Sequence, residues 1–185
     1  MENLDPLRHR LGASRADVAE WSLPRDVLLP GAVTGTFGAL LMLAVALPLG
    51  ALTSGDAWYA ARLAGGVFFR EEPVGPWAVV LGLLVHLTTA SGVATLFALL
   101  LPRGGTATAA LMLGLLMGLM LQAVMPPLIV PFASPPLARE APDSALFLLH
   151  LVFGASLAII VPLRRLLGSA DLVRRSVHPL REPHA

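Results

Sequence analysis

Residues Val27–Gly55 read VLLPGAVTGTFGALLMLAVALPLGALTSG, without one charged side chain. Three more charge-free stretches follow, at Pro73–Pro102, Gly104–Ala138 and Ser144–Pro162. A membrane-spanning helix needs about 20 mostly apolar residues. Within hydrocarbon such a segment must satisfy its own backbone hydrogen bonds, which an isolated segment does only as a helix. We therefore predict an all-α polytopic membrane protein with a four-transmembrane-helix bundle.

The expected boundaries divide the chain into a cytoplasmic N-terminal segment (1–21), a transmembrane domain (22–163) and a cytoplasmic basic amphipathic tail (164–185). The predicted spans are about 27–49, 76–101, 106–125 and 144–162. The N-terminal segment lacks the apolar core of a signal peptide, so we expect the first span to be retained.

Residue preferences set the expected ends of the spans. Pro102 and the two glycines after Arg103 predict a tight turn between the second and third spans. Pro126 and Pro127 predict the end of the third span, because proline cannot continue a regular helix. Asp143 is the expected N-cap of the fourth span, which we end at Pro162.

Composition agrees with a membrane protein. Hydrophobic residues make up 56% of the chain and charged residues only 14%, against about 25% in a soluble domain. The net charge of +1 gives no general attraction to nucleic acid, and the absence of cysteine excludes disulfides and thiolate metal sites. Every basic residue is arginine, which suggests a GC-rich bacterium and hence the bacterial inner (cytoplasmic) membrane.

The arginines also predict an orientation. If the N-terminus is cytoplasmic, ten arginines lie inside and only Arg62, Arg70 and Arg139 lie outside. Cytoplasmic loops of membrane proteins carry the excess of Arg and Lys. An even number of spans then puts both termini in the cytoplasm.

The two external connections are unusual. In residues 56–70 apolar and aromatic side chains recur at roughly helical spacing, at Trp58, Tyr59, Leu63, Val67 and Phe68. The expected interfacial anchors are Trp58, Tyr59, Arg62, Phe68 and Phe69. We predict a short helix here, either lying in the headgroup layer or packed over the end of the bundle. The second connection, 126–142, contains six prolines, so we expect an extended segment that is either a lid, a shallow re-entrant loop or a rigid connector.

Glycines and histidines recur in alternate spans. The first span carries Gly31, Gly35 and Gly38, and the third carries Gly114 and Gly118. Small residues allow close helix packing in membranes.

The second and fourth spans each hold one histidine beside a glycine. His86 follows Gly82 by one turn, and His150 precedes Gly154 by one turn. This pattern suggests two copies of a helical hairpin, although any small apolar bundle uses glycine for close contacts.

The residues 58–63 and 67–69, with the histidine helices around His86 and His150, resemble a family of uncharacterised bacterial four-span membrane proteins. The resemblance covers most of residues 30–165. It implies the same four-span architecture and carries no activity with it.

Histidine within a span is costly and suggests a function. His86 and His150 have similar expected depths, so they could bind a haem b axially, and Gln122 could bind a quinone headgroup. The alternative is that each imidazole bonds a neighbouring helix, with Thr88, Thr89, Ser91 or Gln122 as partner. We favour this packing role, since two histidines without a supporting shell are weak evidence for a cofactor.

No acidic residue lies within a span, and we find no catalytic or metal-binding motif. We therefore expect a non-catalytic accessory or scaffold subunit of a larger bacterial membrane complex, such as a respiratory or photosynthetic assembly. Its partners would be the lipid bilayer and other membrane subunits. The alternative is a membrane redox protein that binds haem b or quinone through His86 and His150.

Overall fold

The structure, a computed structural model, describes residues 22–102 and 104–177, with side chains as far as 170. The predicted N-terminal segment 1–21 and the last tail residues, 178–185, lie outside the described residues. Every regular element in the described part is a helix. Four helical stretches are long and apolar enough to cross a membrane: Pro24–Ser54, Gly75–Leu100, Ala107–Ala133 and Asp143–Ala170. The predicted all-helical class and multi-pass character are therefore confirmed.

The first span begins with a π-helical turn, η1 (Pro24–Leu28), and continues as α2 (Leu29–Ser54). The prediction that it ends near residue 49 is wrong, because the helix continues through Pro48. Pro48 removes one backbone donor, yet the helix is unbroken from Leu29 to Ser54. Gly55, with a φ of 69°, ends the helix in a left-handed conformation that glycine adopts without strain.

The second span is α5 (Gly75–Leu100), within one residue of its predicted bounds. The third is α6 (Ala107–Val124), whose N-cap Thr106 accepts a 3.1 Å hydrogen bond from the Ala109 amide.

The proline-rich connection contradicts the prediction of an extended segment. It forms η2 (Met125–Ile129), α7 (Val130–Ala133) and α8 (Pro135–Glu140). Each of these segments has proline in at least one of its first two positions. In α8, which starts after the non-helical Ser134, the missing N–H would have had no helical partner. Pro126 and Pro127 instead lie where the continuous helix takes the π-helical form η2. Pro126 and Pro127 therefore do not end the third span, which continues to Ala133.

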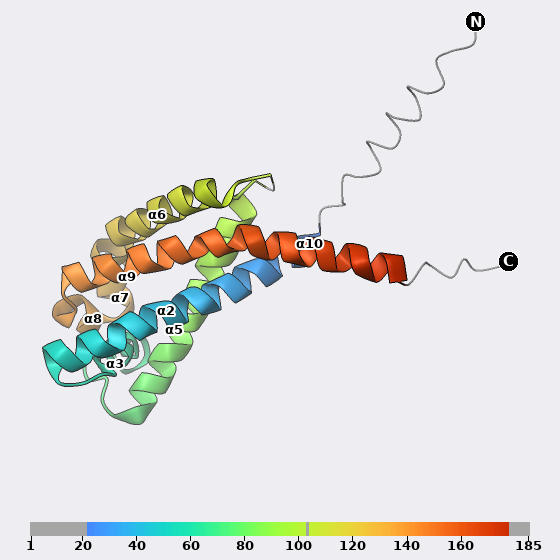
Figure 1. Cartoon of the computed structure of the whole chain (residues 1–185). Coiled ribbons are helices and arrows are strands. Elements are labelled where there is room, and N and C mark those ends of the chain that lie inside the picture. The colour runs from blue at the N-terminus through green and yellow to red at the C-terminus, as the bar shows by residue number, and fades with distance from the viewer. Residues whose placement is uncertain (1–21, 103, 178–185) are drawn as a thin grey trace, which may run out of the picture.

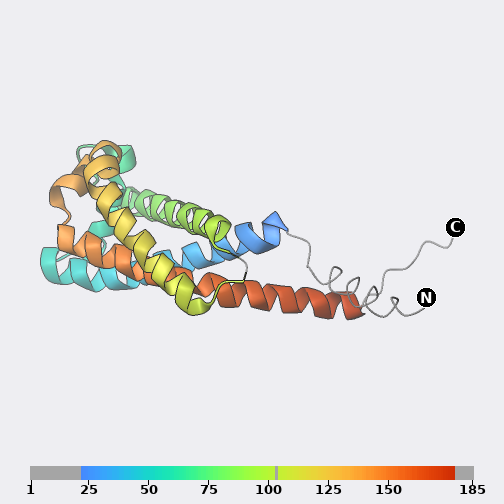
Figure 2. The same ribbon diagram turned by 90° about the horizontal axis from the view of Figure 1, so that it is seen from above.

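The fourth span comprises α9 (Asp143–Ser156), a 3₁₀ turn η3 (Leu157–Ile159) and α10 (Ile160–Val177). Pro142, not Asp143, is its N-cap. Asp143 lies in the first turn, where its negative charge interacts favourably with the helix dipole. The predicted end at Pro162 is also wrong. The 3₁₀ turn brings Pro162 into the first turn of α10, and the helix extends beyond the other spans (Figures 1 and 2).

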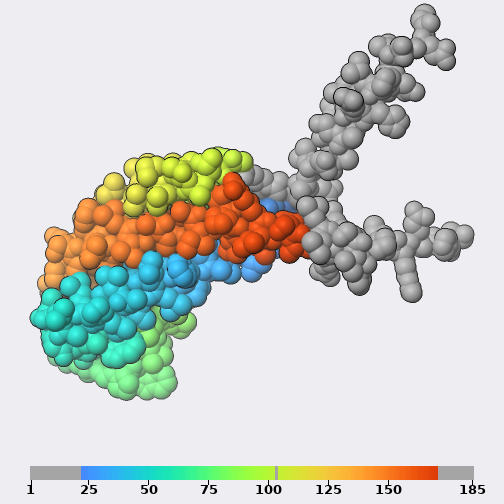
Figure 3. Space-filling model, in the orientation of Figure 1, coloured from blue at the N-terminus to red at the C-terminus, as the bar shows by residue number. Residues whose placement is uncertain are grey.

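The four spans pack in the order α5, α2, α9, α6 (Figure 1). The space-filling view shows α9 between α6 and α2 (Figure 3). Helices α5 and α6 follow one another in the chain but are not among the closely packed pairs. An apolar groove of about 230 Å³ lies between them.

Two further short helices, α3 (Tyr59–Ala64) and α4 (Gly66–Phe69), cover one end of the spans. They pack against α5 and α8, and Ser134 donates a 2.6 Å hydrogen bond to the Leu63 carbonyl. We call α3, α4 and α8 the cap, and the ends of the spans beside it the cap end. The opposite end, where α10 projects, is the tail end.

Arg164 joins three helices at the tail end. Its Nε donates a 2.7 Å hydrogen bond to the Asp26 carbonyl. Its Nη1 and Nη2 donate hydrogen bonds to the carbonyls of Leu101 and Ala98. Pro30 and Pro102 stand four residues after Asp26 and Ala98, so neither can supply the helical N–H that these carbonyls would normally receive. The arginine thus satisfies acceptors that the two prolines leave open.

Candidate functional site

The two intramembrane histidines bond to different neighbouring helices. His86 on α5 has its Nε2 3.3 Å from the Ala39 carbonyl oxygen on α2. His150 on α9 has its Nδ1 2.8 Å from Oε1 of Gln122 on α6. Each imidazole therefore links its own helix to the next one in the packing order.

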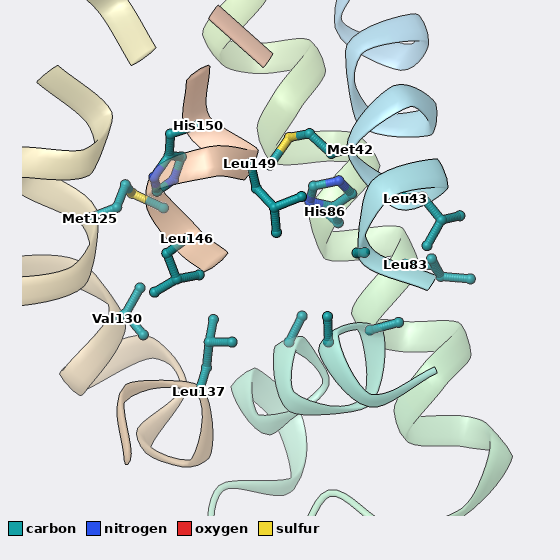
Figure 4. A pocket seen from close by; sticks show the side chains of 14 residues that line it. Met42, Leu43, Leu83, His86, Met125, Val130, Leu137, Leu146, Leu149 and His150 are labelled. Carbon is teal, nitrogen blue, oxygen red and sulfur yellow. The ribbon is translucent and has the colours of Figure 1, made fainter. Parts of the chain in front are cut away.

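Both histidines line a cavity of about 160 Å³ under the cap (Figure 4), and both also line a smaller one of about 80 Å³ on the side of Ala90 and Phe153. Apart from the imidazoles, the walls of the cavity under the cap are aliphatic side chains and methionines from α2, α3, α5, α9 and the segment 125–137. In this view the Leu149 side chain lies between the two rings. The cavity is an apolar space with two nitrogen-containing rings in its wall.

A second cavity, of about 320 Å³, adjoins the first. The two share the lining residues Ala46, Ala60, Leu137, Leu146 and Leu149. The second cavity extends toward the cap end. Its polar lining residues are Thr53, Tyr59 and Ser144.

The cap over these cavities is held by polar contacts. The Tyr59 hydroxyl on α3 donates a 3.0 Å hydrogen bond to Glu140 on α8. Burial raises the pKa of Tyr59 above its ordinary 10.0, and the hydrogen bond to Glu140 and its negative charge raise it further. Arg62 forms a salt bridge with Asp56, and Arg70 donates a 2.8 Å hydrogen bond to the Phe132 carbonyl.

Some of the predicted interfacial anchors make contacts within the protein, and others are exposed on its surface. Tyr59 and Arg62 bond within the cap region, whereas Trp58, Phe68 and Phe69 are exposed. Ala61 and Leu63 are buried on α3. The first connection therefore packs over the end of the spans, and its exposed aromatic rings remain available to the headgroup layer.

The predicted packing glycines of the first span lie at helix contacts. A Cβ built on Gly31 or Gly35 would overlap α5, at Thr95 and Ser91 respectively. A Cβ on Gly38 would lie 2.5 Å from the Ser156 hydroxyl of α9.

The same holds for the remaining glycines. A Cβ on Gly82 would overlap the Ala61 carbonyl of α3, so this glycine serves the cap and not a flat cofactor beside His86. Gly114 and Gly118 on α6 face Gly154 and the His150 carbonyl on α9.

Sequence reasoning found part of this site. Gln122 was among the expected histidine partners, and the structure brings it to His150. Thr88 instead bonds carbonyls of its own helix, and Ser91 lies 3.4 Å from Thr36 on α2. The Ala39 carbonyl was missed, because a backbone acceptor leaves no mark in the sequence. The described residues contain no group of three metal-ligating side chains.

No protein-family model matches the chain, and no match was found among curated protein sequences or solved structures. The function is therefore argued from the geometry of the chain itself.

Proposed function

We propose that this protein is a non-catalytic accessory or scaffold subunit of a larger membrane complex. The observation that carries the proposal is the groove between α5 and α6. The residues that line it are all apolar and come from α5 with its C-cap and from α6: Phe97, Leu100, Leu101, Leu113, Leu116, Met117 and Met120. A transmembrane helix of a partner subunit is the occupant that we propose, because two helices joined in sequence but apart in packing leave room for a third between them.

The polar side chains of the spans support the non-catalytic part of the proposal. His86, His150, Gln122 and Ser91 all take part in contacts between this chain's own helices. Their positions are thus explained by packing without a substrate.

A photo-crosslinking residue tests the partner. Leu100 lines the groove and is 67% exposed, whereas its neighbour Leu99 is 52% exposed and does not line it. A crosslinker at Leu100 should join one membrane subunit that also co-purifies in fixed ratio under mild detergent, and one at Leu99 should not. Crosslinking to lipid alone at Leu100, with recovery of a free monomer or homodimer, would contradict the proposal.

The finer architecture belongs to the same proposal. Both termini face the cytoplasm of a bacterial inner membrane, in line with the arginine distribution. The chain contains two related hairpins, α2 with α5 and α6 with α9. The support is that in each pair the glycines of the first helix meet the second, at Gly35 and Ser91 and at Gly114 and Gly154.

The competing proposal is a redox protein with haem b or quinone. Its support is that His86 and His150 line one cavity. However, a cavity of about 150 Å³ holds a molecule the size of benzene, whereas haem is a far larger planar macrocycle of four linked pyrrole rings. A Soret band in the purified protein that disappears in both His86→Ala and His150→Ala would establish haem; its absence after expression with sufficient haem would remove this proposal.

A further inference from the structure

The hydrogen bonds of the two histidines fix where their lone pairs lie. A charge within a span is costly, so each imidazole is neutral, with one N–H and one lone pair. The Ala39 carbonyl can only accept, so Nε2 of His86 donates and its Nδ1 keeps the lone pair. Oε1 of Gln122 can likewise only accept, so Nδ1 of His150 donates and its Nε2 keeps the lone pair.

Each ring therefore keeps one free acceptor and no further donor, and both rings lie in the wall of the cavity. A quinone carbonyl needs a hydrogen-bond donor, so these histidines do not suit it. A hydroxyl group suits them, because its hydrogen can be donated to either free nitrogen. The rest of the wall is apolar, and a cavity of about 160 Å³ has room for one six-membered ring.

We propose that this cavity binds a ring-sized apolar molecule that carries a hydroxyl group, of the phenol type, and that it accepts the hydroxyl hydrogen at His86 Nδ1 or His150 Nε2. The adjoining cavity, which shares five lining residues, gives such a molecule a path from the cap end past Tyr59. This inference is independent of the accessory-subunit proposal, since a subunit can bind a small molecule whatever its partner.

The test compares 4-fluorophenol with 4-fluoroanisole, its methyl ether, by ¹⁹F NMR on the full chain in lipid nanodiscs. The two probes have the same ring, but only the phenol can donate. Empty nanodiscs measure the partitioning of each probe into lipid. After that correction the phenol should bind about five to ten times more tightly, the worth of one hydrogen bond. Equal affinity for the two probes, or no saturable binding of either, would overturn the proposal.

Variants locate the acceptor. His86→Phe and His150→Phe keep a flat ring but remove the lone pair, and at least one of them should abolish the preference for phenol. Thr88→Ala, on the same helix as His86 but with its hydroxyl bonded to its own turn, should leave it unchanged. A preference that survives in both phenylalanine variants would refute the assignment.

A second variant keeps the test valid if the histidine variants do not fold. Ala46 is buried and lines both cavities. Ala46→Phe should fill the space and abolish saturable phenol binding, with both histidines intact. Undiminished binding in this variant would show that the probe lies elsewhere. ¹⁵N shifts of the two imidazoles provide an independent check, because a proton on Nε2 of His150 would contradict the proposed acceptor there.

Discussion

Arg164 shows how one residue can compensate for two prolines in different helices. Pro30 and Pro102 leave the carbonyls of Asp26 and Ala98 without helical donors, and the guanidinium supplies them. We expect Arg164→Ala to lower the free energy of unfolding by about 2–3 kcal/mol, because buried acceptors would lose a charged donor. Arg164→Lys should recover only part of this stability, because an ammonium group cannot reproduce the geometry in which the planar guanidinium donates to three carbonyls at once. Thermal unfolding in detergent measures both.

The neighbouring Arg165 provides the control. It is exposed, so Arg165→Ala should change the midpoint of unfolding little. Equal effects of the two alanine variants would mean that the three carbonyl bonds contribute nothing specific.

Tyr59 is a second residue with a measurable signature, because it is the only tyrosine in the chain. Its pKa is raised in the folded protein by burial and by Glu140. The neutral hydroxyl is thus favoured on folding, so its contribution to stability is complete below about pH 10 and is lost as the pH rises through the raised pKa. Tyrosinate absorbance should titrate with a midpoint above 10.0.

Two variants separate the causes of that shift. Glu140→Gln should lower the midpoint, but not to the ordinary value, because burial is the larger cause. Glu72→Gln, at an exposed residue between the cap and α5, should leave it where it is. A midpoint at or below 10 in the unaltered protein would contradict the contact between α3 and α8.

At the scale of helices, α6 and α9 approach so closely at Gly114, Gly118 and Gly154 that no side chain fits at these positions. A Cβ on Gly118 would lie 2.5 Å from the His150 carbonyl oxygen, which is backbone and cannot turn aside. We expect Gly118→Leu to lower the free energy of unfolding by about 1–3 kcal/mol through overpacking, with a smaller loss for Gly118→Ala. Gly92→Ala is the matched control, because that glycine faces open space. If the Gly118 variants unfold like the Gly92 variant, the two helices are farther apart than described.

Helix ends show why the spans were predictable and their connections were not. Hydrocarbon requires an apolar length, and that length can be counted in the sequence. The effect of a proline depends on its position: it fits the start of α8, and it is tolerated where a continuous helix takes the π form at η2, within α2 and after η3. Gln122 could be anticipated as a histidine partner from its residue type. The role of Arg164 could not, although two prolines at the same end of the spans were the signal that some donor was needed there.

For the molecule as a whole, the distribution of charge and the number of spans make one joint prediction. The structure puts the tail end, with Arg25, Arg164 and Arg165, opposite the cap, where Arg62, Arg70 and Arg139 lie. The segments of sequence joined to the tail end add seven more arginines, at positions 8, 10, 15, 103, 174, 175 and 181, which makes ten against three. Cytoplasmic segments carry the excess of arginine, so we expect the tail end in the cytoplasm.

Reporter fusions measure that orientation directly. A reporter that is active only in the cytoplasm should work when fused after Ala185 and fail when inserted at residues 71–74, between the cap and α5. A reporter active only outside should give the reverse pattern. Adding arginines to the 71–74 segment should weaken the preference, because the positive-inside bias would then be divided between the two ends. The same sidedness at both sites would mean an even number of spans between them, whereas the structure places three there: Gly75–Leu100, Ala107–Ala133 and Asp143–Ala170.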